Sequence, residues 1–233
     1  MDQRLARDPA AIRAMFQEVA PRYDLLNRAL SLRQDVRWRR RLVAALGEAP
    51  AGPVLDLATG TGDVALAVRD RVVIGGDFSL PMLELAGRKA RRFGRLVAWV
   101  AADALALPFK AASFAAVTAA FGVRNFVDLA VGFREIGRVL VPGGILAVLE
   151  LHRPRRTVVA GIVRIWNRFV VTPVGRLVSH DGDAYGYLPA SVDTFPDRVE
   201  MAEVLRGQGF AVLESRDLSG GVAALTVARW EGA

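Results

Sequence analysis

Apolar and polar positions follow a regular rhythm along the chain, in which short apolar runs alternate with amphipathic stretches. The apolar runs predict strands at 54–57, 72–76, 96–101, 113–119 and 145–151. The amphipathic stretches between them predict helices at 63–70, 81–92 and 127–140. Near-continuous apolar strands that alternate with helices are typical of a parallel, doubly wound sheet. We therefore expect an α/β fold whose ligand lies at the carboxyl ends of the strands.

A glycine turn follows the first of these strands. The sequence Val54-Leu-Asp-Leu-Ala-Thr-Gly-Thr-Gly-Asp63 contains an acid, Asp56, four residues before Gly60, and a second glycine, Gly62. Such a turn lets the backbone approach a bound nucleoside closely. An acid ahead of the turn is typical of S-adenosylmethionine (SAM) methyltransferases. Because SAM carries a cationic amino acid end, a carboxylate near the loop suits it.

A dinucleotide is the alternative ligand for the same loop. Gly60, Gly62 and Ala65 fit the G-x-G-x-x-A fingerprint, and Asp77 lies near the distance expected of a ribose-binding acid. Two features favour SAM: Asp56 would be unwelcome beside a pyrophosphate, and Asp103 adds an acid after a third apolar run. Asp77 can also be interpreted as an acid at a helix N-terminus, since Ser79 and Pro81 resemble a cap and a first turn. Ribose binding and helix capping are compatible.

Helical patterns flank this core. One over residues 12–19 ends at Pro21, and others cover 23–32 and 36–46. A helix at 198–206 and strands at 209–214 and 222–229 close the chain. We expect a class I SAM-dependent methyltransferase fold, Rossmann-like, with a mostly parallel seven-stranded sheet, N-terminal helices and a helical insertion after the fifth strand. The expected single domain, 1–233, comprises a lid at 1–48, a SAM-binding core at 53–152, a substrate or membrane insertion at 153–195 and a C-terminal helix and strands at 196–230.

Composition narrows the chemistry. The chain has no cysteine and two histidines, so thiolate and histidine-rich metal sites are excluded and we expect no metal. No apolar run is long enough to span a bilayer, and the start lacks a secretory pattern, so we expect a cytoplasmic protein. The net charge is +7, and only Lys89 and Lys110 among the cationic residues are not arginine. This charge favours an anionic lipid leaflet or a polyanion, unless it merely reflects a general preference for arginine.

The insertion contains an amphipathic stretch. Its apolar positions share one helical face, and arginines occupy and flank the other: Ile162, Ile165, Trp166, Phe169 and Val170, against Arg153, Arg155, Arg156, Arg164, Arg168 and Arg176. This pattern fits a helix that lies in a membrane interface or covers an apolar pocket. An ordinary helix packed on the domain would show a similar pattern.

Three further segments carry a family resemblance. They are Tyr23-Asp-Leu-Leu-Asn-Arg-Ala-Leu-Ser31 with Trp38-Arg-Arg40, Phe121-Gly-Val-Arg-Asn125, and 138–150 with its Pro-Gly-Gly turn. Together with 185–196 they resemble the menaquinone/ubiquinone C-methyltransferase family over about residues 11–229. The resemblance implies methyl transfer from SAM to a ring carbon of a reduced, prenylated naphthoquinol, or alternatively of the benzoquinol of ubiquinone synthesis. It also implies a membrane-resident substrate, and hence peripheral contact with an anionic leaflet.

The resemblance also implies the cofactor contacts. Gly60, Gly62 and Thr61 would form the loop, and Asp77 would bind the ribose. Asp103 and Ala104 would lie beside the adenine. Ala120 stands where relatives have a serine, so only its backbone could contact SAM.

Proton handling is open in the sequence. Arg124 and Asn125 are expected on the substrate side of the cleft, where Arg124 could stabilise a naphtholate or make a surface or capping contact. Tyr23, Asp24 and Asn27 would form the lid over SAM, and Asp24 is a candidate base or a helix cap. His152 is a candidate base or a structural histidine, and His180 with Asp181 could act as a base and its orienting partner. The chain departs from the family at Asp35, His152 and Thr226, where a histidine, a serine and a histidine are frequent.

Two rival functions are weaker. An RNA methyltransferase would suit the basic charge, but the Asn/Asp-Pro-Pro-aromatic turn typical of amino-group methylation is replaced by Ala120-Phe-Gly-Val-Arg-Asn125, and no RNA-binding module is evident. We therefore expect no nucleic-acid partner. A non-catalytic SAM-binding or lipid-binding protein is the second rival.

Overall fold

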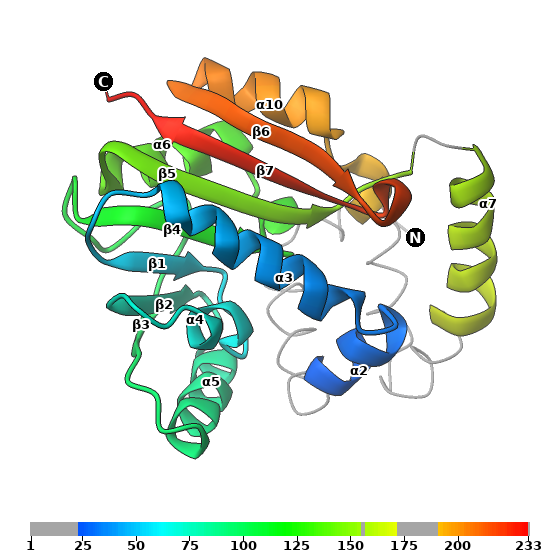
Figure 1. Ribbon diagram of the computed structural model, residues 1–233, viewed down its shortest axis with the longest axis horizontal. Coiled ribbons are helices and arrows are strands. Elements are labelled where there is room, and N and C mark those ends of the chain that lie inside the picture. The colour runs from blue at the N-terminus through cyan, green and yellow to red at the C-terminus, as the bar shows by residue number, and fades with distance from the viewer. Residues whose placement is uncertain (1–22, 155–156, 172–190, 233) are drawn as a thin grey trace.

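A computed structural model describes residues 23–154, 157–171 and 191–232 (Figure 1). Seven strands in this part of the chain form one sheet in the order β3-β2-β1-β4-β5-β7-β6. Their bounds are β1 Val54–Leu57, β2 Val73–Asp77, β3 Ala98–Ala101, β4 Phe114–Ala120, β5 Leu140–Leu151, β6 Phe210–Leu218 and β7 Ala223–Trp230. The expected seven-stranded α/β fold is confirmed.

The sheet is parallel except for β7, which pairs antiparallel with both β5 and β6. Leu57 at the end of β1 lies opposite Gly76 in β2 and Ala119 in β4. These three strands therefore end at nearly the same level. The chain order reverses between β1 and β4, so this edge is the switch point at which α/β sheets bind ligands.

Helices cover both faces of the sheet (Figure 1). The elements outside the sheet are α2 Tyr23–Leu30, α3 Gln34–Ala44, η3 Ala45–Glu48, α4 Asp63–Ala67, α5 Leu80–Arg92, η4 Val123–Asn125, α6 Leu129–Val139, α7 Thr157–Trp166, the π-helical η5 Asn167–Val171, α10 Arg198–Gly207 and η6 Ser219–Gly221. Trp38 and Leu42 of α3 and Val64 of α4 pack in one buried cluster. Phe133 of α6 and Leu205 of α10 pack in another. Burial of these two apolar layers is the main force that holds the sheet between them.

Element ends differ from the sequence expectation where local polar contacts decide them. α6 begins at Leu129, because the carboxylate of Asp128 accepts a hydrogen bond from the Val131 amide at 3.0 Å. β3 begins at Ala98 and lies at the sheet edge, so the side chain of Leu96 is fully exposed. β5 begins at Leu140 and includes the expected Pro-Gly-Gly turn. At this turn the pairing of β5 with β4 shifts register, between Phe114 and Ala116 of β4. The helix expected at 12–19 lies outside the described residues.

α7 stands away from the sheet (Figure 1). Its Trp166 indole donates to the carbonyl of Leu30 at 3.1 Å, and Val159 packs on Gly220. The adjacent face presents Val158, Ile162 and Ile165, and the following η5 presents Phe169, each 61–75% exposed. The expected amphipathic helix is therefore present, but most of its apolar stripe lies in the open. Among the described residues, no helix is long and apolar enough to cross a membrane.

Candidate cofactor and substrate site

The glycine loop after β1 turns sharply at Ala58, Gly60 and Gly62, which all have positive φ angles. A Cβ at Gly60 would meet no atom within 4 Å, so the loop faces open space there. At Gly62 the space is filled, since a Cβ would lie 2.6 Å from the Trp99 ring. The missing side chain of Gly62 thus makes room for Trp99, whereas the missing side chain of Gly60 leaves open space.

Asp56 lies beneath this loop and is 1% exposed. Its carboxylate accepts hydrogen bonds from Thr59 Oγ1 at 2.5 Å, Thr118 Oγ1 at 2.7 Å and the Ala65 amide at 3.0 Å. Burial raises the pKa of Asp56 to about 6, although these three donors act against it. The structure therefore places Asp56 as an internal support of the loop, not as a group that reaches the cationic end of SAM.

Asp77 joins the loop to α5. Its carboxylate accepts from the Gly60 amide at 2.8 Å and from the Ser79 amide at 2.9 Å, and the residue is buried. Burial raises the pKa of Asp77, and the amide hydrogen bonds oppose that shift. Ser79 precedes α5 as expected of a cap, but its hydroxyl makes no capping bond. The Asp77 carboxylate therefore holds the amide of Ser79 just ahead of α5, which is compatible with ribose binding.

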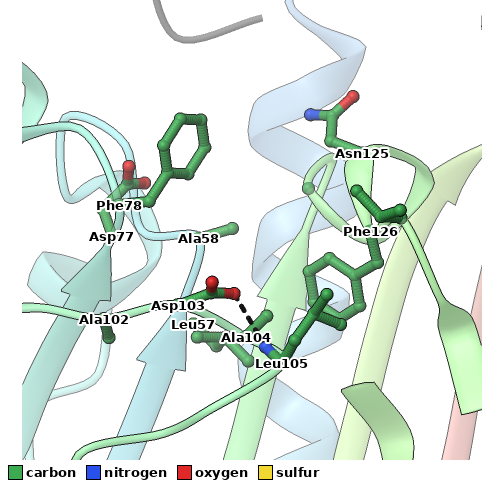
Figure 2. A pocket seen from close by; sticks show the side chains of 12 residues that line it. Leu57, Ala58, Asp77, Phe78, Ala102, Asp103, Ala104, Leu105, Asn125 and Phe126 are labelled. Carbon is green, nitrogen blue, oxygen red and sulfur yellow. Dashed lines mark hydrogen bonds between the residues drawn. The ribbon is translucent and has the colours of Figure 1, made fainter. Parts of the chain in front are cut away.

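A cleft opens above Asp77 at the carboxyl ends of β1, β2 and β4. It encloses about 760 Å³, its open mouth included. Its lining residues are Leu57, Ala58, Asp77, Phe78, Ala102, Asp103, Ala104, Leu105, Gly122, Asn125, Phe126 and Val127. Figure 2 shows Phe78 and Asn125 rising on opposite sides, and the Asp103 carboxylate accepting from the Leu105 amide at 2.9 Å. Four residues expected at the site, Asp77, Asp103, Ala104 and Asn125, thus meet in one cleft.

α2 is tied to the glycine loop by charge. Thr61 Oγ1 donates to Asp24 at 2.5 Å, and Lys89 of α5 donates to Asp24 at 2.6 Å and pairs with Asp63. Arg39 lies 3.3 Å from Asp63. Burial raises the pKa of Asp63, but the neighbouring cations outweigh burial and hold the pKa below its ordinary value. The Asp24 carboxylate therefore connects α2 to the glycine loop through Thr61 and Lys89.

α2 also includes two further residues expected in the lid, Tyr23 and Asn27. Tyr23 begins the helix, and the side chain of Asn27 is half-buried.

Arg124 does not line the cleft. Its guanidinium is 5% exposed and donates from Nη1 to Glu150 at 2.6 Å and to the Phe121 carbonyl at 2.7 Å. The next residue, Asn125, occupies the position on the cleft that we expected both to share. The expectation for Arg124 is corrected because its charge is turned inward, toward the end of β5.

His152 directly follows β5 and is buried, with its ring centroid 5.6 Å from that of Phe195. Burial lowers the pKa of His152, which keeps the imidazole neutral near pH 7. Ala120 packs on the α3 side of the sheet and is not part of the cleft lining. The pair His180 and Asp181 lies outside the described residues.

The other two family departures are structural. Asp35 pairs with Ser31 and Arg39, and Thr226 lies buried in β7.

Sequence reasoning missed several residues of the site. Glu150 and Lys89 hold charged neighbours in place, and Phe78, Leu105 and Phe126 form apolar walls. Lys89 left a signal, because it is one of two lysines in a chain that otherwise uses arginine. Glu150 left another, because it is a carboxylate within an apolar strand.

Comparison with known proteins decides the family. Residues 4–229 match the ubiE/COQ5 methyltransferase family. The chain belongs to this family. One relative is the demethylmenaquinone methyltransferase of Thermus thermophilus, which is 48% identical to this chain over 218 residues, 91% of this chain and 98% of the relative. The ubiquinone/menaquinone biosynthesis C-methyltransferase UbiE of Syntrophotalea carbinolica is 43% identical over 217 residues, 91% of each chain. The resemblance drawn from the sequence motifs is confirmed.

Solved structures agree on the fold. A SAM-dependent methyltransferase of Thermotoga maritima, described as a possible histamine N-methyltransferase, aligns with a TM-score of 0.63 at 18% identity and covers 94% of this chain and 99% of its own. A SAM-dependent methyltransferase of Aquifex aeolicus aligns with a TM-score of 0.60 at 16% identity, over 82% and 89% of the two chains. The family member described here is therefore a SAM-dependent C-methyltransferase with a class I fold, and SAM is its cofactor.

Proposed function

We propose that the enzyme methylates demethylmenaquinol at a ring carbon and yields menaquinol. The observation that carries the proposal is the identity of 48% to a relative named demethylmenaquinone methyltransferase, over nearly the whole of both chains. The cleft supports it, because its position at the switch point and its buried Asp77 suit a nucleoside donor. The alternative substrate is the benzoquinol of ubiquinone synthesis, which the double name of the Syntrophotalea relative favours.

The residues present fit SAM. The carboxylate of Asp77 can accept hydrogen bonds from ribose hydroxyls, and the open space at Gly60 admits a ligand to the loop backbone. Phe78, Leu105 and Phe126 offer apolar surface to an adenine ring. When bound, SAM supplies a methyl group on a positively charged sulfur, with a neutral thioether as the leaving group.

The chain's own residues then have to orient the quinol and manage its protons. A phenolic hydroxyl has a pKa of about 10, so donors beside its oxygen favour the anion that activates the ring carbon. Asn125 lies on the cleft, where its carboxamide can donate such a hydrogen bond. His152 is held neutral by burial and could accept a proton at the end of β5. The apolar walls of the cleft, among them Phe78, Leu105 and Phe126, offer a surface on which the quinol ring can pack.

We further propose that α7 lies in the interface of an anionic leaflet, where a prenylated quinol resides. Four large apolar side chains, Val158, Ile162, Ile165 and Phe169, stand exposed on one face. Arg164 and Arg168 are exposed beside them. The sequence from 151 to 180 contains six arginines and no aspartate or glutamate. One of the six, Arg153, pairs with Asp193 at 3.1 Å, and the remaining excess of cations beside exposed apolar residues fits an anionic membrane surface better than a neutral one.

The reaction is tested with purified enzyme, SAM and two reduced acceptors, a short-chain demethylmenaquinol and the matching benzoquinol. We expect a product about 14 Da heavier than the naphthoquinol, because a methyl group replaces a ring hydrogen. The naphthoquinol should react faster than the benzoquinol.

Asp77→Asn should raise the Kd for SAM about tenfold or more, because it removes a charged acceptor. Asp70→Asn, an exposed acid on the adjoining turn, is the control. Turnover of neither acceptor would overturn the proposal.

A further inference from the structure

Glu150 is a buried carboxylate that the reaction scheme leaves unused. It lies near the end of β5, is 1% exposed, and uses both of its oxygens. Oε1 accepts from Arg124 Nη1 at 2.6 Å and from the Leu151 amide at 2.9 Å. Oε2 accepts from the backbone amide of Arg124 at 3.2 Å. One carboxylate therefore holds Arg124 by its main chain and by its guanidinium.

The turn that Glu150 holds is short and tightly packed. Phe121 has a φ angle of 61°, which a non-glycine residue adopts only under constraint. A Cβ on Gly122 would lie 2.3 Å from the Cβ of Ala58, so the turn sits directly on the glycine loop. The Asn125 amide donates to the Gly122 carbonyl at 3.0 Å and closes the turn. The place of Asn125 on the cleft therefore depends on how this turn is anchored.

The geometry points to Glu150 as a positioning residue for methyl transfer. Its hydrogen bonds to the backbone amide and to the guanidinium of Arg124 fix η4 and so keep Asn125 on the cleft. Its negative charge also offsets the charge of the Arg124 guanidinium. The inference rests on the proposed function, because it concerns the acceptor side of that same cleft. A misplacement of about 1 Å in a positioning group can lower a rate by as much as about a hundredfold, so loss of the Glu150 contacts should lower kcat.

A second glutamate–arginine pair, more exposed than Glu150 and Arg124, provides a control with similar hydrogen bonds. Glu135 accepts from Arg138 Nε at 2.8 Å and from the Leu107 amide at 2.8 Å, so it also holds one arginine and one backbone amide. It lies on α6, and the cleft lining does not include it. Glu135→Gln thus removes the same kind of interaction without touching η4.

The experiment compares wild type, Glu150→Gln, Glu150→Asp and Glu135→Gln. For each, kcat and KM for the quinol are measured at saturating SAM, with the Kd for SAM by calorimetry and Tm as a check on folding. We expect Glu150→Gln to lower kcat about tenfold or more while the Kd for SAM stays within about threefold, because the ribose side is intact. Glu150→Asp keeps the charge, but its shorter side chain cannot reach all three donors, so its kcat should lie between those of wild type and Glu150→Gln. Glu135→Gln should keep kcat within about twofold.

A pH profile separates positioning from bulk stability. Without the Glu150 charge, the positive charge of Arg124 is less offset and favours an anionic bound quinol, so the acid-side pKa of kcat should fall in Glu150→Gln relative to wild type. The inference is overturned if Glu150→Gln loses no more kcat than Glu135→Gln and its pH profile is unchanged. Should Glu150→Gln fail to fold, the same comparison applies to Glu150→Asp. Absence of quinol turnover in wild type would instead overturn the proposed function.

Discussion

At the scale of single residues, Asp56 gives the sharpest test of the glycine loop. Its folded pKa of about 6 lies above the ordinary 3.8, so the folded state binds the proton more tightly than the unfolded chain. The free energy of unfolding should then fall as pH rises through 6, by about 2 kcal/mol between about pH 4.5 and about pH 7.5. Asp56→Asn removes the ionisation and should remove this part of the pH dependence. Urea unfolding at the two pH values measures it.

The matched control for Asp56 is Asp70→Asn, since Asp70 is exposed on the turn after α4. It should leave the pH dependence of unfolding as in wild type. Equal pH dependence in Asp56→Asn and wild type would show that the carboxylate is not protonated in the folded loop. That result would instead fit an ionised carboxylate held by the hydroxyl donors of Thr59 and Thr118.

At the scale of elements, α2 depends on Lys89. This ammonium lies between Asp24 and Asp63, with Thr61 Oγ1 at 3.4 Å, a site where a compact cation fits. Lys89→Met leaves two carboxylates facing each other, so α2 should loosen from the loop and the Kd for SAM should rise about tenfold. Calorimetry with SAM measures the change. Lys110→Met, at the other, exposed lysine, is the control, and equal affinity of the two variants would contradict the role.

A second substitution tests whether the change in the Kd for SAM comes from the ion pair of Lys89 with Asp24. Adding Asp24→Asn to Lys89→Met removes one uncompensated charge and should recover part of the lost affinity. No recovery would indicate that Lys89 acts on the loop without Asp24.

Elements were largely foreseeable from sequence, whereas the orientation of side chains within them was not. The parallel strands and Asp77 at the end of β2 follow from apolar runs and a terminal acid. The packing of Gly62 against Trp99 could not be predicted, because it joins residues 37 positions apart, and no local pattern signals such a contact. Arg124 and Asn125 stand side by side in sequence, and only the buried partner Glu150 decides which of them turns inward.

At the scale of the whole molecule, charge and exposed apolar surface gather on α7, apart from the sheet (Figure 1). If this surface meets a leaflet, wild type should co-sediment with vesicles that contain phosphatidylglycerol more than with phosphatidylcholine alone. Ile162→Glu with Phe169→Glu should abolish binding, because it places two charges in the apolar stripe. Arg164→Gln with Arg168→Gln should weaken binding to anionic vesicles about tenfold or more and reduce its salt dependence, at about 1 kcal/mol per arginine.

Phe93 and Leu96 are a matched pair of exposed apolar residues just after α5, the helix that lies well apart from α7 in Figure 1. Phe93→Glu with Leu96→Glu adds the same charge and should leave vesicle binding unchanged. Because the vesicles contain no quinol and turnover is measured on a short-chain acceptor, membrane binding and catalysis are scored separately. If the α7 pair binds vesicles as wild type does, the leaflet is not its partner. If gel filtration instead shows that the α7 pair breaks a dimer, the stripe is an interface between two copies of the chain.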